Sequence, residues 1–227
     1  MEIDDKLQNL YAMRFDGELS RKNAMWRVLI SSFFQQYVKE SDTVLDIGGG
    51  YCEFINNIKC CRKYVVDLNE DILKFANPDV QPFNSRLSEI ASLLESSIDV
   101  VFMSNFLEHL RSKEEVLKTL SDVFNILKTG GTLIILQPNI RYAYKVYWDF
   151  FDHNIPLSDR SIAEALQLTG FKVDRLIPRF LPYTTKSKIP QNTFLVKAYL
   201  KMPLVWKILG KQMLVICHRD KKGERLK

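Results

Sequence analysis

The fold follows from one short segment, Val44-Leu45-Asp46-Ile47-Gly48-Gly49-Gly50-Tyr51-Cys52-Glu53-Phe54. An apolar run of β-like composition ends at Asp46, breaks into glycines and resumes with helical spacing. This order predicts a strand, a tight turn and a first crossover helix over Cys52 to Ile58. Glycine at 48 and 50 permits a positive φ and lets a nucleotide-like ligand approach the backbone, although an ordinary strand–helix corner can carry the same glycines.

Two later segments end in polar residues at comparable positions. Tyr64-Val65-Val66 leads to Asp67, which lies 21 residues after Asp46, where doubly wound folds place a carboxylate against two ribose hydroxyls. Ile98 to Ser104 is a third apolar run, and the sequence NFLEHL follows it from Asn105. Because open α/β sheets bind ligands at the carboxyl edge, these strand ends predict one binding site.

The three segments read DIGGG, VVDLNED and DVVFMSNFLEHL, and together they resemble the class I S-adenosylmethionine-dependent methyltransferases over about residues 40 to 180. In that family a D-x-G-x-G loop, an acidic second strand end and a fourth strand of this type occur in the same order. Cys52 stands where the family loop commonly has a third glycine, and its small size should preserve the loop. Dinucleotide oxidoreductases share the first loop but use G-x-G-x-x-G, whereas Glu53 stands at the last of those positions.

The resemblance implies S-adenosylmethionine as the cofactor. The residues implied to bind it are Asp46, Gly48, Gly49, Gly50, Asp67, Leu68, Leu87, Ser88, Asn105 and Arg14. Many relatives place an aspartate after the third strand to meet the adenine amino group, but residues 85–89 here read SRLSE. We therefore expect adenine to contact the backbone near Leu87 and Ser88, with Glu89 as a weaker candidate. Arg14 lies where the family places a lid segment, and a surface ion pair is its alternative role.

The apolar periodicity and the resemblance together predict an α/β fold: a Rossmann-like doubly wound sheet, mostly parallel with an antiparallel last strand, and with helices on both faces. The expected strands cover residues 44–46, 61–67, 80–83, 98–104, 132–136, 172–178 and 213–217. The expected helices cover residues 5–12, 22–39, 52–58, 71–76, 90–94, 114–127, 161–169, 192–202 and 204–209. A glycine cap is expected at 128–131, after the helix over 114–127, and a loop at 137–142. We divide the chain into an N-terminal helical lid (1–40), a methyltransferase domain (41–218) containing a basic helical insertion (179–210), and a charged tail (219–227).

Composition limits the class of protein. With 227 residues, of which 46% are hydrophobic, the chain can bury one sizeable core, and a second domain would be cramped. Its four cysteines contain no C-x-x-C pair, which argues against a disulfide framework, and with only three histidines we predict no metal site. The start of the chain lacks a signal-like pattern and no apolar run reaches roughly eighteen residues, so we expect a cytoplasmic protein that is neither secreted nor membrane-spanning.

Charge is divided unevenly along the chain. Residues 1–170 hold 18 Lys/Arg and 24 Asp/Glu, whereas residues 171–227 hold 14 and 3. The insertion in this basic part also carries apolar residues, which predicts an anionic, partly apolar acceptor such as a lipid-linked sugar, and peripheral contact with an anionic membrane at the inner face. Packing onto the sheet or into a homodimer interface is the alternative. Nucleic acid ranks lowest as a partner, because the rest of the chain is acidic.

Methyl transfer to a hydroxyl requires a general base, and the segment after the fifth strand offers one. Histidine titrates near neutral pH, so we expect His153, backed by Asp152 or Asp149, to take this role, with Asp152 as the second catalytic residue. Capping of the next helix is the alternative role of His153. His109 is expected to be structural.

Four segments suggest the acceptor. PNIRY, WDFFDH, PLSDRS and FLPYTTKS resemble a bacterial group of methyltransferases of polysaccharide and lipid-linked glycan biosynthesis. The resemblance implies O-methylation of a hydroxyl on a sugar or on a nucleotide- or lipid-linked glycan precursor. The residues expected to contact this acceptor are Tyr11, Arg141, Tyr142, Tyr183 and Lys186. A methyltransferase for another small molecule and a non-catalytic cofactor-binding scaffold subunit are the alternatives.

Overall fold

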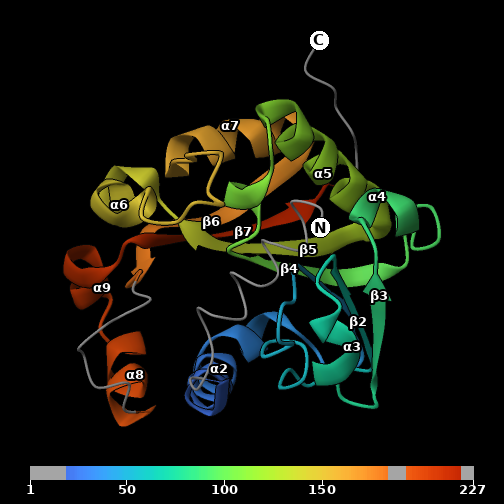
Figure 1. The fold of residues 1–227 in the computed structure, drawn as a ribbon, viewed down its shortest axis with the longest axis horizontal. Helices are drawn as coiled ribbons and strands as arrows, with labels where there is room; N and C mark the ends of the chain where they lie inside the picture. Colours follow the sequence, from blue (N-terminus) through green and yellow to red (C-terminus); the bar gives the residue numbers. More distant parts are fainter. Residues whose placement is uncertain (1–18, 184–192, 221–227) are drawn as a thin grey trace.

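The computed structural model describes residues 19–183 and 193–220, which fold around one sheet of seven strands (Figure 1). The strands are β1 (Thr43–Ile47), β2 (Arg62–Asp67), β3 (Val80–Asn84), β4 (Ile98–Ser104), β5 (Leu127–Pro138), β6 (Phe171–Leu181) and β7 (Gln212–Arg219). Their order across the sheet is β3-β2-β1-β4-β5-β7-β6, in which β1 to β5 pair in parallel and β7 is antiparallel to both β5 and β6. The predicted Rossmann-like sheet with an antiparallel last strand is confirmed.

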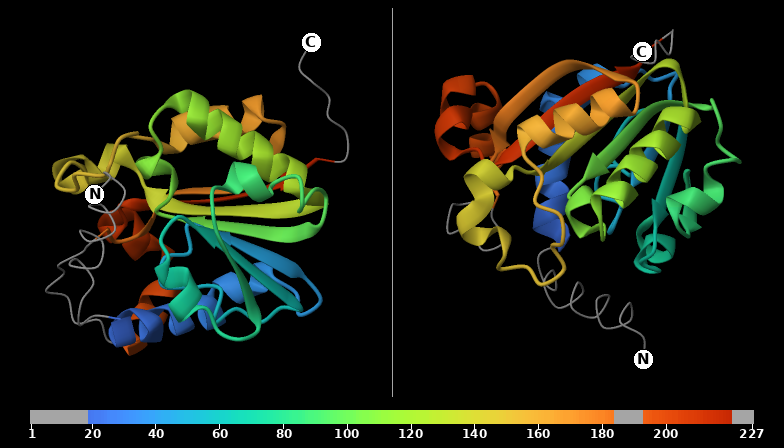
Figure 2. Two further views of the ribbon diagram at one scale, coloured as in Figure 1. Left: turned by 45° about the vertical axis from the view of Figure 1, so that its right-hand side comes forward. Right: turned by 90° about the horizontal axis from the view of Figure 1, so that it is seen from above.

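Helices cover both faces of the sheet, as Figure 2 shows. Above the sheet in the view of Figure 1 lie α4 (Leu87–Ile90), α5 (Lys113–Ile126), α6 (Ile140–Tyr147) and α7 (Asp159–Leu168). The opposite face carries α2 (Leu19–Ser32), the 3-10 helix η1 (Phe34–Tyr37), α3 (Asp71–Phe75) and α8 (Thr193–Leu200), while α9 (Pro203–Leu209) packs against β6. A second 3-10 turn, η2 (Leu107–His109), follows β4.

Each face of the sheet has its own apolar core. In β4, Val101 and Met103 belong to the core beneath α5, whereas Val100 and Phe102 belong to the core on the other face. All four side chains are at most 2% exposed, which explains why this strand is a continuous apolar run rather than an alternating one. The two cores hold the strand ends, and the polar residues that follow them, in fixed positions.

The predicted helix over residues 52–58 is wrong, because residues 53–57 form consecutive turns. Cys52 has a φ of 61°, a left-handed conformation that interrupts helical geometry at the expected first residue. Asn56 then bonds outside its own segment: its side chain donates to the carbonyl of Phe75 at 2.7 Å and accepts from the N–H of Asn77 at 2.9 Å. Such side-chain hydrogen bonds compete with the backbone hydrogen bonds of a helix. The segment that connects β1 to β2 is therefore bonded to the end of α3 instead.

The segments on either side of β5 also differ from the prediction. The expected loop over 137–142 contains the start of α6, which Asn139 caps by accepting from the N–H of Arg141 at 3.2 Å. The predicted glycine cap at 128–131 is wrong, because β5 begins at Leu127, directly after α5. Leu127 is fully buried and pairs with Ile98 of β4, so the backbone changes from helix to strand at this residue without a connecting turn.

The insertion before β7 contains the two predicted helices. Trp206 of α9 is 5% exposed, its ring lies 5.0 Å from that of Phe180, and its Nε1 donates to the carbonyl of Tyr199 at 2.7 Å. Helix α8 packs against α2, so one side of the insertion is core. The other side exposes large apolar side chains, namely Phe194, Leu195, Met202, Leu204, Ile208 and Leu209. None of the helices in residues 19–183 and 193–220 has the length and apolar character that a bilayer-crossing segment needs.

The predicted N-terminal lid is described only in part, because residues 1–18 lie outside the described residues. The expected helix over 22–39 is α2 followed by η1. Trp26 of α2 packs against Phe54 and Phe102, with ring centroids 6.2 and 5.9 Å apart, and none of residues 19–37 lines the cavity at the strand ends. These residues therefore serve the core of one sheet face.

Candidate functional site

An open cavity of about 990 Å³ lies at the carboxyl ends of β1, β2, β3 and β4. This is the edge at which open α/β sheets bind their ligands. Of the residues predicted to bind the cofactor, those on the cavity wall are Gly48, Gly50, Asp67, Leu68, Leu87, Ser88 and Asn105. Arg14 lies outside the described residues. The structure therefore gathers most of the predicted contacts around one cavity, although they come from four separate segments.

The glycine turn wraps over the end of β2. Gly48 has a φ of 71° and its N–H donates to the carbonyl of Val66 at 2.9 Å. A Cβ at Gly48 would lie 2.6 Å from Cδ2 of Phe106, so glycine is required here by backbone conformation and by packing together. The turn is thus locked between β2 and the segment after β4.

Asp67 closes β2 and faces the cavity. Its Oδ2 accepts from the N–H of Gly50 and its Oδ1 from the N–H of Asn69, both at 2.9 Å. Burial raises the pKa of this carboxyl group, and the backbone donors oppose that rise. Each carboxylate oxygen has a further lone pair, so the group can still accept from two ligand hydroxyls.

Asp46 and Gly49, also predicted to contact the cofactor, are not among the cavity-lining residues. Asp46 is 3% exposed, and burial together with the nearby charges of Glu53 and Asp67 raises its pKa well above the usual value. Gly49 lies against Val65, which a Cβ would strike. Both residues therefore support the turn from beneath.

The cavity suits an adenosine nucleoside by the chemistry of its wall. Asp67 offers a carboxylate for the paired ribose hydroxyls, and Leu68 and Leu87 add apolar surface for a flat base. Ser88 and Asn105 supply polar groups on the same wall. The residues present therefore fit the cofactor that the sequence implies.

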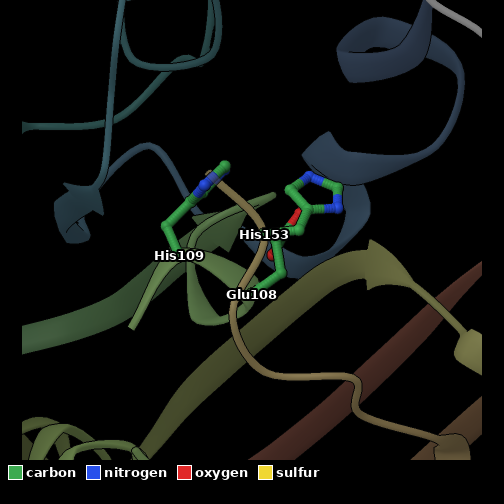
Figure 3. Close-up of side chains that lie close together, drawn as sticks. All are labelled: Glu108, His109 and His153. Atoms are coloured by element: carbon green, nitrogen blue, oxygen red, sulfur yellow. The ribbon is translucent and has the colours of Figure 1, made fainter. Parts of the chain in front are cut away.

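A second group of side chains borders this cavity, and we call it the Glu–His corner: Glu108, His109, Asp152 and His153. His109 and Asp152 line the cavity, whereas Glu108 and His153 lie behind them, 1% and 6% exposed. Figure 3 shows Glu108 between the two imidazoles, with His153 coming from a separate loop.

Backbone hydrogen bonds join the two segments of the Glu–His corner. The carbonyl of Glu108 accepts from the N–H of Asn154 at 2.8 Å and from that of Ile155 at 3.1 Å. The side-chain amide of Asn154 donates to the carbonyl of His109 at 3.1 Å. The corner is therefore preformed in the fold.

Each histidine of the corner has a polar neighbour. Nδ1 of His109 lies 3.0 Å from the carbonyl oxygen of Asp152 and 3.4 Å from its Oδ2, which favours a proton on Nδ1 and a lone pair on Nε2. Nε2 of His153 lies 3.3 Å from the hydroxyl of Tyr183. The rings of Phe150 and Tyr147 enclose His153, with centroids 4.8 and 4.6 Å from its own.

Glu108 is the most deeply buried member of the corner. Burial raises its pKa to about 7, a nearby Asp152 carboxylate adds to the rise, and the charge of His109 opposes it. Glu108 lies within the LEHL motif, for which the sequence predicted no chemical role, and His109 was expected to be structural. The signal that could have found them is their position directly after a strand end, next to Asn105.

The residues predicted to contact the acceptor do not gather in one place. Tyr11 and Lys186 lie outside the described residues. Nη1 of Arg141 pairs with both carboxylate oxygens of Asp159 at 3.0 Å, and the guanidinium lies 5.5 Å from the ring of Tyr142. Neither Arg141 nor Tyr142 lines the cavity, whereas Tyr183 does reach His153 of the corner.

Comparison with known sequences identifies a family. Residues 19–176, more than half of the chain, match the sequence model of a methyltransferase domain. No curated protein sequence matches.

Solved structures share the fold at low sequence identity. An S-adenosylmethionine-dependent methyltransferase from Archaeoglobus fulgidus is 23% identical, with a TM-score of 0.65, and the match covers 92% of this chain and 98% of that one. A complex between the Haloferax volcanii Trm112 methyltransferase activator and a methyltransferase matches at 16% identity and a TM-score of 0.67, covering 92% and 96%. Geranyl diphosphate C-methyltransferase from Streptomyces coelicolor A3(2), solved with Mg²⁺, geranyl diphosphate and S-adenosyl-L-homocysteine, matches at 15% identity and 0.59, covering 87% and 80%. The chain therefore belongs to the methyltransferase domain family and is an S-adenosylmethionine-dependent methyltransferase.

Proposed function

We propose that this enzyme methylates a hydroxyl group on a sugar or on a lipid- or nucleotide-linked glycan precursor. The observation that carries the proposal is the Glu–His corner, which places a carboxylate-held imidazole on the wall of the cofactor cavity. A hydroxyl has to lose its proton as it is methylated, and an imidazole oriented by a carboxylate is well suited to assist that loss.

The other residues of the cavity hold the cofactor and the acceptor in place. Asp67 would accept from the ribose hydroxyls, the backbone near Leu87 and Ser88 would meet adenine, and Asn105 would face the methionine portion. When bound, S-adenosylmethionine supplies a methyl group activated by its sulfonium. The chain therefore has mainly to orient the acceptor oxygen and exclude water from it.

Within the corner, the structure favours His109 over His153 as the group nearest the acceptor. His109 lines the cavity and is oriented by Asp152, while His153 is enclosed by aromatic rings. We propose that the corner acts as a unit, in which His109 and Asp152 face the acceptor and His153 supports them from behind.

Methyl transfer from S-adenosylmethionine to a panel of nucleotide sugars and lipid-linked glycans tests the proposal. His109→Ala should lower kcat about 10²- to 10⁴-fold, the usual contribution of a positioned acid–base group. His218→Ala is the matched control, because His218 lies on β7 and pairs with Asp174 at 2.7 Å, outside the cavity lining. An undiminished rate in His109→Ala would overturn the role of the corner, and no wild-type turnover on any member of the panel would reject the sugar and glycan acceptors in favour of another small molecule.

The exposed side of the insertion supports a partly apolar, anionic acceptor. Lys197 on α8, Lys207 on α9 and Lys201 in the turn between them are exposed, among the exposed apolar side chains of the same segment. The structurally similar geranyl diphosphate C-methyltransferase was solved with geranyl diphosphate, a molecule with an apolar chain and phosphates. We propose that this surface, the α8–α9 surface, contacts the lipid or the anionic membrane that presents the acceptor.

Co-sedimentation with anionic vesicles tests the α8–α9 surface. Each lysine near such a membrane contributes about 1 kcal/mol, so Lys197→Glu with Lys201→Glu should release the protein at low ionic strength. Lys39→Glu with Lys59→Glu makes the same change in charge at exposed lysines elsewhere. Equal loss in both double variants, or no wild-type binding, would remove the membrane contact and leave a soluble acceptor.

A further inference from the structure

Glu108 is 1% exposed, and within the described residues neither of its carboxylate oxygens has a hydrogen-bond partner. Burying a carboxylate without partners is costly unless the group is neutralised by a proton or by a cation. The backbone carbonyl of Glu108 accepts from the N–H groups of Asn154 and Ile155, so the backbone that carries this side chain is held in place. The arrangement therefore calls for either a proton or a bound cation at the carboxylate.

Two imidazoles stand beside this carboxylate. The candidate ligand atoms of Glu108, His109 and His153 all lie within 4.8 Å of one another, and the two imidazole rings are 5.1 Å apart. Ligand atoms at about 2.0–2.2 Å from a shared cation are separated by roughly 3–3.5 Å, so a modest closing of side chains would complete the site. Figure 3 shows the side chains of Glu108, His109 and His153 close together.

The surroundings of the two histidines match those of metal ligands. A metal-binding histidine commonly donates its second ring N–H to a carboxylate or a carbonyl, which fixes the tautomer. Asp152 offers both groups to Nδ1 of His109, at 3.4 and 3.0 Å. The Tyr183 hydroxyl lies 3.3 Å from Nε2 of His153 and can orient that ring in the same way.

We infer that Glu108, His109 and His153 form a binding site for one divalent transition-metal ion. Two imidazoles and one carboxylate favour Zn²⁺ and its neighbours over Mg²⁺, which prefers oxygen ligands. Three histidines in the chain predict no histidine-rich cluster, but two histidines and a buried carboxylate are sufficient ligands for one ion. Since His109 lines the cavity, an ion held there would be within reach of an acceptor bound in the cavity.

The role of the ion rests on the proposed function, whereas its binding does not. An acceptor hydroxyl at an open position loses its proton at lower pH, because a bound cation stabilises the alkoxide. The O–H bond breaks and the proton passes to water in the open cavity. His109 is then a ligand of the ion and does not itself take up the proton, so this role of the ion would replace the base role proposed for His109 above.

Titration of the chelator-treated protein with Co²⁺ and with Zn²⁺ tests the site without any methyl acceptor. We expect one ion per chain, with visible Co²⁺ absorption bands from nitrogen ligation. Glu108→Gln and His153→Ala should each weaken binding by more than about 100-fold, and Asp152→Asn, which keeps all three ligands, by about 10–100-fold. His218→Ala should bind like the wild type. Binding of S-adenosylhomocysteine, measured on every variant, shows whether the variant is folded.

The outcomes separate the two proposals. A wild-type protein that takes up no ion, or folded Glu108→Gln and His153→Ala variants that bind like the wild type, would overturn the metal site. Metal uptake without methylation of any hydroxyl would retain the site and reject the proposed function. Methylation that continues unchanged after removal of the ion would retain the function and overturn the role given to the ion.

Discussion

Asp67→Asn keeps the size of the side chain but removes the charge that we expect the ribose hydroxyls to meet. In the folded chain the two carboxylate oxygens of Asp67 accept from the N–H groups of Gly50 and Asn69, each at 2.9 Å. An amide has only one oxygen, so one of these N–H groups would face an NH₂ donor. The variant loses one hydrogen bond of the glycine turn as well as the charge on the ligand side.

The substitution should affect ligand binding much more than stability. A hydrogen bond to a charged group contributes about 1.5–3 kcal/mol, so the loss of one ribose contact should raise the Kd for S-adenosylhomocysteine about 10- to 150-fold. For unfolding the effects oppose one another: burial raises the pKa of Asp67, so a neutral amide relieves desolvation while the turn loses a bond. Affinity should therefore fall much more than thermal stability.

Isothermal titration calorimetry with S-adenosylhomocysteine measures this loss. Asp79→Asn is the control, because Asp79 is an exposed carboxylate that pairs with Lys63 at 2.8 Å and is not part of the cavity wall. Its Kd should equal that of the wild type. An Asp67→Asn protein that binds as tightly as the wild type, or a wild type that prefers NAD, would refute the assignment of ribose to Asp67.

Gly48→Ala should weaken binding of S-adenosylhomocysteine by about 1–3 kcal/mol. A non-glycine residue is strained at a φ of 71°, and its Cβ would collide with Phe106. Equal affinity of the variant and the wild type in calorimetry would contradict this account. Asp46→Asn should flatten the dependence of Tm on pH. Burial raises the pKa of Asp46 well above its usual value, so its contribution to stability is present below about pH 4 and is lost as pH rises. An equal change of Tm with pH in the variant and the wild type would count against this. Phe180→Ala should lower the free energy of unfolding in urea by about 3–5 kcal/mol, since Phe180 is fully buried, whereas Leu168→Ala, at a side chain 74% exposed, should change it by less than about 0.5 kcal/mol.

Local sequence predicted the sheet and the glycine turn because a few adjacent residues determine each of them. The apolar run of β4 and the carboxylate that ends β2 mark a doubly wound sheet without knowledge of the rest of the chain. The crossover after β1 was predicted wrongly for a different reason. Its course depends on the positive φ of Cys52 and on the bonds of Asn56 to residues near α3, which helical periodicity does not record.

The Glu–His corner could not be predicted as a unit, because its halves are far apart in sequence and are joined by the bonds from Asn154 and Ile155 to Glu108. The sequence did single out His153 and Tyr183 separately, one as a base and one as an acceptor contact, and the fold brings them to 3.3 Å. It could not show that Arg141 is held by Asp159, because that pair forms only once α6 and α7 are placed side by side.

The position of β7 in the sheet has a consequence for folding during synthesis. Strand β7 follows β6 along the chain but lies between β5 and β6 in the sheet. On the ribosome, about 80 residues separate the end of β5 from the end of β7, which takes roughly 4–16 s at the usual rates of synthesis. During that interval β5 presents an open apolar edge, including Leu133 to Leu136, and β6 has no partner strand. A nascent chain stalled before residue 212 should therefore bind chaperones or aggregate with other such chains through its open strand edges, rather than fold into a smaller sheet.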